Sequence, residues 1–152
     1  MKILLAVDGS PDAQKAVDEV QARPWPLGSA VKVVSVVQPM VPPTPELAVG
    51  STWDDLSQER TDAARKLVSR VARVLKPVVP HVQSVVRQGD APTEILAEAN
   101  EWQADLIIVG SHSRSRLERL FLGSVAQSII NDSPCSVEIV RPRGMPNTVS
   151  MR

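Results

Sequence analysis

Several residue types are scarce in this chain of 152 residues, and each scarcity excludes a class of protein. The single cysteine, Cys135, excludes an internal disulfide framework and fits a reducing compartment. Three tryptophans, one phenylalanine and no tyrosine leave too few aromatic side chains for a surface that stacks nucleic-acid bases. Seventeen basic and seventeen acidic residues cancel, so no global field would attract nucleic acid or an anionic membrane.

Long hydrophobic runs are also missing, since no apolar segment approaches the length of a membrane-spanning helix. The run from Ile3 to Val7 stops at Asp8, too early for the core of a secretory signal, so we expect a cytoplasmic protein with no membrane contact. The length fits one domain. We assign residues 1–141 to that domain and expect 142–152, which contain Pro142 and Pro146, to form a flexible tail.

The motifs of common phosphate-transferring enzymes are absent as well. The chain has no Gly-x4-Gly-Lys-Ser/Thr loop, and therefore lacks the lysine that reaches the β- and γ-phosphates of a nucleotide. The pyrophosphatase-type motif Ser-Gly-Gly-x-Asp-Ser is also missing. No nucleophile has an evident base partner, and no ligand spacing predicts a metal site. We expect no catalytic residue and no resident metal.

Strand-like and helix-like segments alternate through the rest of the chain. Apolar or β-branched runs predict five strands, at residues 3–7, 31–37, 82–87, 106–109 and 137–140. Apolar residues at helical spacing lie between them. Such alternation predicts an α/β fold, with an open parallel sheet and helices on both of its faces.

Four segments carry helix start signals. Ser10-Pro11 predicts an N-cap and a first helical residue, followed by an apolar stripe at Ala13, Ala16, Val17 and Val20. Pro92 opens a helix with the apolar residues Ile95, Leu96, Ala99 and Trp102. Capping boxes are predicted at Thr52 with Asp55 and at Ser124 with Gln127. For the long helix after Thr52 the expected stripe is Leu56, Ala63, Leu67, Val71 and Val74.

The fourth predicted strand leads into a candidate phosphate cradle. It ends at Val109-Gly110, a polar loop with His112 and Ser113 follows, and Gly123-Ser124 opens the next helix. Glycines give a ligand access to the main chain, and the free N–H groups at a helix start attract anions. Asp8, after the first strand, can accept hydrogen bonds from a ribose hydroxyl or an adenine amino group. His112 is either a phosphate donor or an exposed loop side chain.

These segments resemble the universal stress protein family. The nucleotide signature of that family is Gly-x2-Gly-x9-Gly-Ser/Thr, in which Gly110, Gly123 and Ser124 match and Ser113 replaces the second glycine. The likeness covers nearly the whole chain, with further matching segments at residues 6–10, 36–37, 89–92 and 105–140. It implies a Rossmann-like fold of the adenine nucleotide alpha hydrolase type, with strand order 3-2-1-4-5.

The resemblance also implies a ligand and a partner. ATP would be the ligand, with any Mg2+ arriving on the nucleotide, and hydrolysis would be slow at most. Asp8 and Val36 would hold the adenosine. The ribose and phosphates would be lined by Val109, Gly110, Ser113, Gly123, Ser124 and Val125. A homodimer is implied, and the predicted edge strand from Ser136 to Val140 suits pairing across a two-fold axis.

Ser113 separates two functional hypotheses. A serine there makes positive φ uncommon and narrows the approach of a phosphate, although its hydroxyl can itself donate to phosphate. One hypothesis is a dimeric module for stress-response signalling that binds ATP or another adenine nucleotide. The alternative is a stress protein of the same fold that binds no nucleotide and acts through protein–protein interaction.

Overall fold

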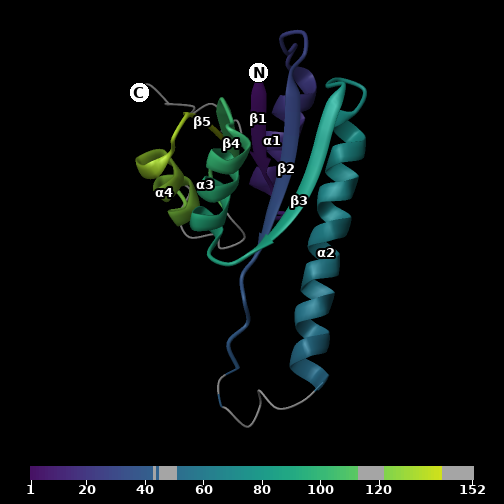
Figure 1. Ribbon diagram of the computed structural model, residues 1–152, viewed down its shortest axis with the longest axis vertical. Coiled ribbons are helices and arrows are strands. Elements are labelled where there is room, and N and C mark those ends of the chain that lie inside the picture. Colours follow the sequence, from purple (N-terminus) through teal and green to yellow (C-terminus); the bar gives the residue numbers. More distant parts are fainter. Residues whose placement is uncertain (43, 45–50, 113–121, 142–152) are drawn as a thin grey trace, which may run out of the picture.

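The computed structural model describes residues 1–42, 44, 51–112 and 122–141, with the side chains of 51 and 52 excepted. Its centre is a parallel sheet in the order β3-β2-β1-β4-β5, which confirms the expected α/β fold and strand order (Figure 1). The strands are β1 (Lys2–Ala6), β2 (Ala30–Val37), β3 (His81–Gln88), β4 (Leu106–Gly110) and β5 (Ser136–Val140). The sequence predicted each to within one residue at either end.

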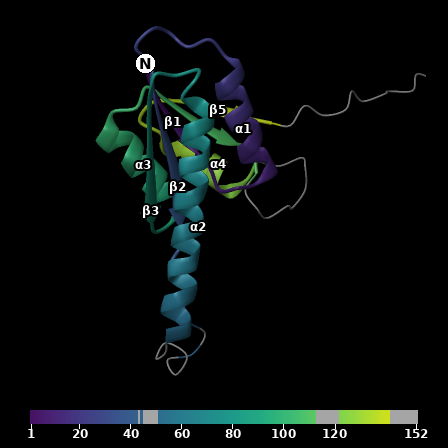
Figure 2. The ribbon, with the colours of Figure 1, turned by 90° about the vertical axis from the view of Figure 1, so that its right-hand side faces the viewer.

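Helices cover both faces of the sheet, as expected (Figure 2). They are α1 (Pro11–Ala22), α2 (Ser51–Leu75), α3 (Ala91–Trp102) and α4 (Ser124–Asp132). Alternating strand residues divide the core in two. Leu5 and Val33 belong to the core shared with α1 and α2, whereas Leu4 and Val34 belong to the core shared with α3 and α4.

The start of α1 follows the sequence signals closely. Ser10 has an extended backbone, and its hydroxyl accepts a hydrogen bond from the Ala13 N–H at 3.1 Å. Pro11 takes the first helical position, where its missing N–H leaves no bond unmade. All four residues of the expected stripe are buried, so this prediction is confirmed.

The long helix α2 departs from its prediction in two ways. It already includes Ser51, so Thr52 lies within the helix and is not its cap. The expected stripe is also wrong in part, because Leu56, Ala63 and Val74 are exposed. The buried residues of α2 are Thr61, Ala64, Val68, Val71, Ala72 and Leu75.

The burial pattern of α2 reflects its position. At about 1.5 Å per residue its 25 residues span roughly 37 Å, whereas the 8 residues of β2 span about 26 Å. Its N-terminal end therefore extends beyond the carboxyl end of the sheet (Figures 1 and 2). Asp54 to Arg60 are exposed, and only the following part of the helix packs on strands β2 and β3.

The capping box expected at Ser124 is also wrong. Gly123 is the N-cap of α4, with φ −62° and ψ 152°, and Ser124 is the first residue of the helix. A residue with helical backbone lies inside the first turn and cannot cap it. The N-terminus of α4 has no side-chain cap, whereas Asp90 caps α3 by accepting from the Thr93 N–H at 3.3 Å.

Ion pairs hold α3 over the edge of the sheet. The Arg87 guanidinium on β3 donates to Glu94, Glu98 and Glu101 of α3 over 2.6–3.1 Å. Lys32 of β2 adds a contact of 2.7 Å to Glu98. Hydrogen bonds, the largest from Glu101, raise the pKa of Arg87, and the Arg87 hydrogen bond lowers the pKa of Glu101. We call Arg87 and its three glutamates the Arg87 cluster.

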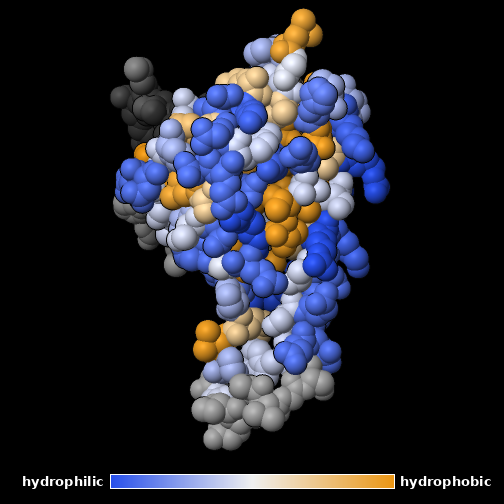
Figure 3. All heavy atoms as spheres, viewed as in Figure 1, coloured by the Kyte–Doolittle hydropathy of each residue, from blue (hydrophilic) through white to orange (hydrophobic). Residues whose placement is uncertain are grey.

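The surface seen in Figure 3 is largely hydrophilic, and apolar side chains gather over β2 and β3 between α3 and α2. Val36 and Val85 are half-buried and pack against the core beneath α3. Among the residues described, no helix combines the length and hydrophobicity needed to cross a membrane.

Candidate functional site

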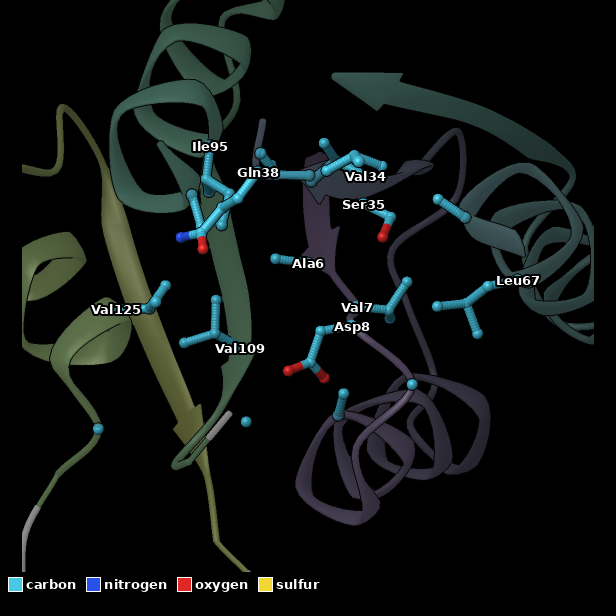
Figure 4. Close-up of a pocket in the computed structure, with 18 of the residues that line it drawn as sticks. Ala6, Val7, Asp8, Val34, Ser35, Gln38, Leu67, Ile95, Val109 and Val125 are labelled. Carbon is cyan, nitrogen blue, oxygen red and sulfur yellow. The ribbon is translucent and has the colours of Figure 1, made fainter. Parts of the chain in front are cut away.

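A cavity of about 560 Å³ opens at the carboxyl end of the sheet (Figure 4). The ends of β1, β2 and β4 form its floor, and residues of α2, α3 and α4 form its walls. β1 and β4 are neighbours in the sheet, and the chain moves outward in opposite directions from them, which makes this the point where strand order reverses. Ligands of open parallel sheets bind at this place.

Most of the residues predicted for the site line this cavity: Asp8, Val36, Val109, Gly110, His112, Gly123 and Val125. Two predicted residues are not among these lining residues. Ser124 is exposed on α4 and does not line the cavity, because the helix turns its side chain outward. Ser113 lies outside the described residues.

Asp8 stands where β1 gives way to α1. Its Oδ1 accepts a hydrogen bond from the Ser10 N–H at 2.9 Å. Gly9, between them, has φ 79°, a left-handed conformation that glycine adopts at little cost. This turn directs the half-buried Asp8 carboxylate into the cavity (Figure 4).

Glycine at position 110 meets a packing requirement. A Cβ on Gly110 would lie 2.6 Å from the carbonyl carbon of Asp12 and 2.8 Å from the Ala13 nitrogen. No atom of a real side chain is tolerated so close to main chain. The glycine therefore allows the first turn of α1 to pack against the end of β4.

A partly buried polar cluster joins α1 to the loop after β4. The Ser111 hydroxyl donates to Asp12 Oδ2 at 2.8 Å, and the His112 N–H donates to the same oxygen at 3.0 Å. His112 Nδ1 lies 3.0 Å from Asp12 Oδ2. The His112 side chain is 21% exposed, so the alternative of an exposed loop histidine does not hold. It lines the cavity in an orientation fixed by Asp12.

The N-terminus of α4 faces the same cavity. The Gly123 N–H donates to the Ser111 carbonyl at 2.8 Å, so this glycine contributes no donor to a ligand. The N-cap residue, Gly123, has no side chain, so no described side chain caps the N–H groups of the first turn that follow. Such groups at a helix start favour a bound anion.

Sequence reasoning missed the contribution of α2. Arg60, Leu67 and Arg70 line the cavity from that helix, and Ser35 lines it from β2. The spacing of Arg60, Leu67 and Arg70 fits one helix face, but no local pattern indicates that this face meets a cavity. In the part of the chain that the structure covers, no cluster of three or more His, Cys, Asp or Glu side chains could hold a metal ion.

Comparison with known proteins identifies the family. The model of the universal stress protein family matches residues 1–141. The chain belongs to this family. A universal stress protein of Thermus aquaticus, encoded in the QAH/OAS sulfhydrylase 3′ region, is 30% identical over 139 residues, which cover 91% of this chain and 97% of that protein.

Solved structures agree with this universal stress protein in fold. The hypothetical protein MJ0577 superposes with a TM-score of 0.82 at 26% identity, covering 95% of this chain and 97% of its own. A universal stress protein in complex with cAMP gives 0.66 at 20% identity, covering 92% and 96%. A family protein of Arabidopsis thaliana with AMP bound gives 0.67 at 15% identity, covering 95% and 93%.

Proposed function

We propose that this universal stress protein binds an adenine nucleotide, ATP among the candidates, in the part of the cavity beneath α3 and α4. The observation that carries the proposal is the grouping of Asp8, Val36, Val109 and Val125 around one cavity at the sheet's switch point. Val36, Val109 and Val125 all belong to the α3 and α4 side of the core. They offer an apolar slot to a flat base.

Polar groups at both ends of this slot suit the rest of a nucleotide. The Asp8 carboxylate is placed to accept from a ribose hydroxyl. The first turn of α4, whose N-cap residue is a glycine, would receive a phosphate, with Mg2+ arriving on the nucleotide if ATP is the ligand. The AMP and cAMP complexes of two proteins of this fold support the same ligand class. Occupancy would then serve stress-response signalling.

The direct test is to denature the purified protein and separate the supernatant by anion exchange. We expect co-purified adenine nucleotide, and titration calorimetry with AMP and with Mg-ATP should give saturable heat. Gly123→Val should abolish that heat, because its side chain fills the approach to the first turn of α4. The φ of −62° at Gly123 suits any residue, so the variant should fold.

Absence of both co-purified nucleotide and heat would contradict the proposal and favour a stress protein that acts through protein–protein contacts alone. Ser113→Gly restores the family's glycine pattern. If the serine limits the site, this variant should bind nucleotide more tightly than wild type in the same titration.

We also propose a homodimer paired through β5. This strand lies at the end of the sheet next to β4, so one of its main-chain edges has no neighbouring strand among the described residues. Open edges of this kind are usually paired or covered.

A further inference from the structure

The cavity extends past the proposed nucleotide site to the other face of the sheet. Ala6 belongs to the core beneath α3 and α4, whereas the next residue, Val7, belongs to the core beneath α1 and α2, and both line the cavity. In Figure 4, Ile95, Val109 and Val125 lie on one side of β1, and Val7 and Leu67 lie on the other. We call the second side, lined by Val7, Ser35, Arg60, Leu67 and Arg70, the α2 pocket.

Ser35 places a hydrogen-bonding group inside the α2 pocket. Val34 and Val36 face α3, so the alternation of β2 turns Ser35 toward α2. The residue is only 5% exposed, and its hydroxyl points into the cavity on the side of Leu67 (Figure 4). No described residue hydrogen-bonds to this hydroxyl. In the described residues, every side-chain N or O atom that is inaccessible to solvent has a hydrogen-bond partner. The Ser35 hydroxyl has none among those residues, so it must be accessible from the cavity.

Two arginines give the α2 pocket its charge. Arg60 and Arg70 are exposed, line the cavity, and form no ion pair or hydrogen bond with the described residues. Leu67 lies between them on the same face of α2. Asp8 is the one acid among the described lining residues, and its carboxylate points away from Leu67 (Figure 4). The pocket therefore has an apolar wall, one internal hydroxyl and a cationic rim.

We propose that the α2 pocket is a second binding site, for a small organic anion with an apolar body. Carboxylates, sulfonates and phosphate monoesters belong to this class. The apolar body would lie against Val7 and Leu67, the Ser35 hydroxyl would bond a polar atom of the ligand, and Arg60 and Arg70 would hold the anionic group. The proposal does not rest on nucleotide binding, because none of these side chains belongs to the proposed nucleotide site.

The test uses two fluorescent probes that differ only in charge. 1-Anilinonaphthalene-8-sulfonate carries a sulfonate, and N-phenyl-1-naphthylamine is the same ring system without it. We expect the full-length protein to bind the sulfonate probe with one-to-one stoichiometry and to prefer it to the neutral probe. The double variant Arg60→Gln/Arg70→Gln should bind the sulfonate probe about tenfold more weakly, since it loses two exposed charge contacts. Its affinity for the neutral probe should not change.

Two further variants sharpen the result. Arg73→Gln removes an exposed arginine of α2 that does not line the cavity, and it should leave both affinities unchanged. Ser35→Ala should weaken the sulfonate probe by about fivefold, the effect of one lost hydrogen bond. Equal affinity of wild type and the double arginine variant would overturn the proposal.

Saturating AMP separates the two sites. The sulfonate probe should retain its affinity for the α2 pocket, with amide shifts at Ser35 and Leu67 in nuclear magnetic resonance spectra. Full displacement by AMP, with shifts confined to Val109 and Val125, would assign the probe to the nucleotide site and overturn the second site. Failure of AMP to bind would count against the nucleotide proposal and leave the probe measurement intact.

Discussion

Gly110 and Gly123 belong to the same motif but meet different physical demands. The Cβ of any other residue at 110 would lie within 2.8 Å of the main chain of α1. At 123 the backbone is extended, with φ −62°, and needs no glycine. The family pattern treats both glycines alike. In this structure, however, Gly110 meets a packing requirement, and Gly123 lines the cavity where a ligand could approach.

Gly110→Ala should lower the free energy of unfolding by about 1–3 kcal/mol, the usual cost of adding atoms to a closely packed site. Gly123→Ala is the matched control, and it should stay within about 1 kcal/mol of wild type because alanine can adopt its backbone angles. Urea unfolding followed by circular dichroism measures both. Equal stability of the two variants would mean that α1 can move away from β4 at little cost.

Several site residues could be predicted one by one from the sequence, but their contacts could not. Asp8 and Gly110 follow strand-like runs, which is enough to place them at the carboxyl edge. Nothing local indicates that Asp12 binds both Ser111 and His112, because those residues are about a hundred positions away. The conformation of His112 therefore depends on a tertiary contact with Asp12 that no local sequence pattern reveals.

At the scale of elements, the Arg87 cluster makes the packing of α3 sensitive to acid. The Arg87 hydrogen bond lowers the pKa of Glu101 in the folded protein. The contribution of Glu101 to stability is therefore complete above the ordinary glutamate pKa, about 4.3, and is lost as pH falls through the lower folded value.

Glu101→Gln should accordingly make the free energy of unfolding fall less steeply with pH below about 4.3 than in wild type. Glu59→Gln serves as the control, since Glu59 is exposed on α2 and forms no ion pair with the described residues. Urea titrations between pH 3 and pH 7 provide the slopes. Identical acid slopes for wild type and Glu101→Gln would show that the Arg87 contact does not persist in solution.

Helices differ in how far their sequences determined them. α1 was predicted well because Ser10-Pro11 fixes its start and twelve residues leave little room for the helical phase to drift. Over the 25 residues of α2 the phase is ambiguous at Ala63-Ala64, and the sequence favoured the exposed alanine. The cavity-facing role of Arg60 and Arg70 depends on where the sheet ends, which is a property of the assembled fold.

At the scale of the whole molecule, alternation of strands and helices determined the fold class, while the strand order came from resemblance to the family. The sheet then presents two edges, β3 and β5. Pairing of β5 with a second β5 uses the same surface on both copies, so it closes at two subunits.

Light scattering should therefore give twice the chain mass of 16.5 kDa at micromolar concentration. Ser136→Lys puts a charge on the pairing strand of each copy, which disfavours strand addition at an open edge, and should shift the mass toward the monomer. His81→Lys makes the same kind of change at the start of β3, the opposite edge, and should leave the dimer intact. A wild-type mass of one chain would contradict the proposed pairing.

The projecting end of α2 would couple ligand binding in the α2 pocket to a surface outside the cavity. Arg60 immediately precedes Thr61, the first buried residue among the described side chains of the helix. The turns from Asp54 onward have little packing to protect them. An anion bound between Arg60 and Arg70 would stabilise the N-terminal turns of α2. The amide hydrogens of those turns would then exchange more slowly with solvent. By thermodynamic reciprocity, a protein that binds the projecting turns would raise the affinity of the α2 pocket for the anion. Helix α2 would then transmit the chemical state of the cavity to a binding partner outside it.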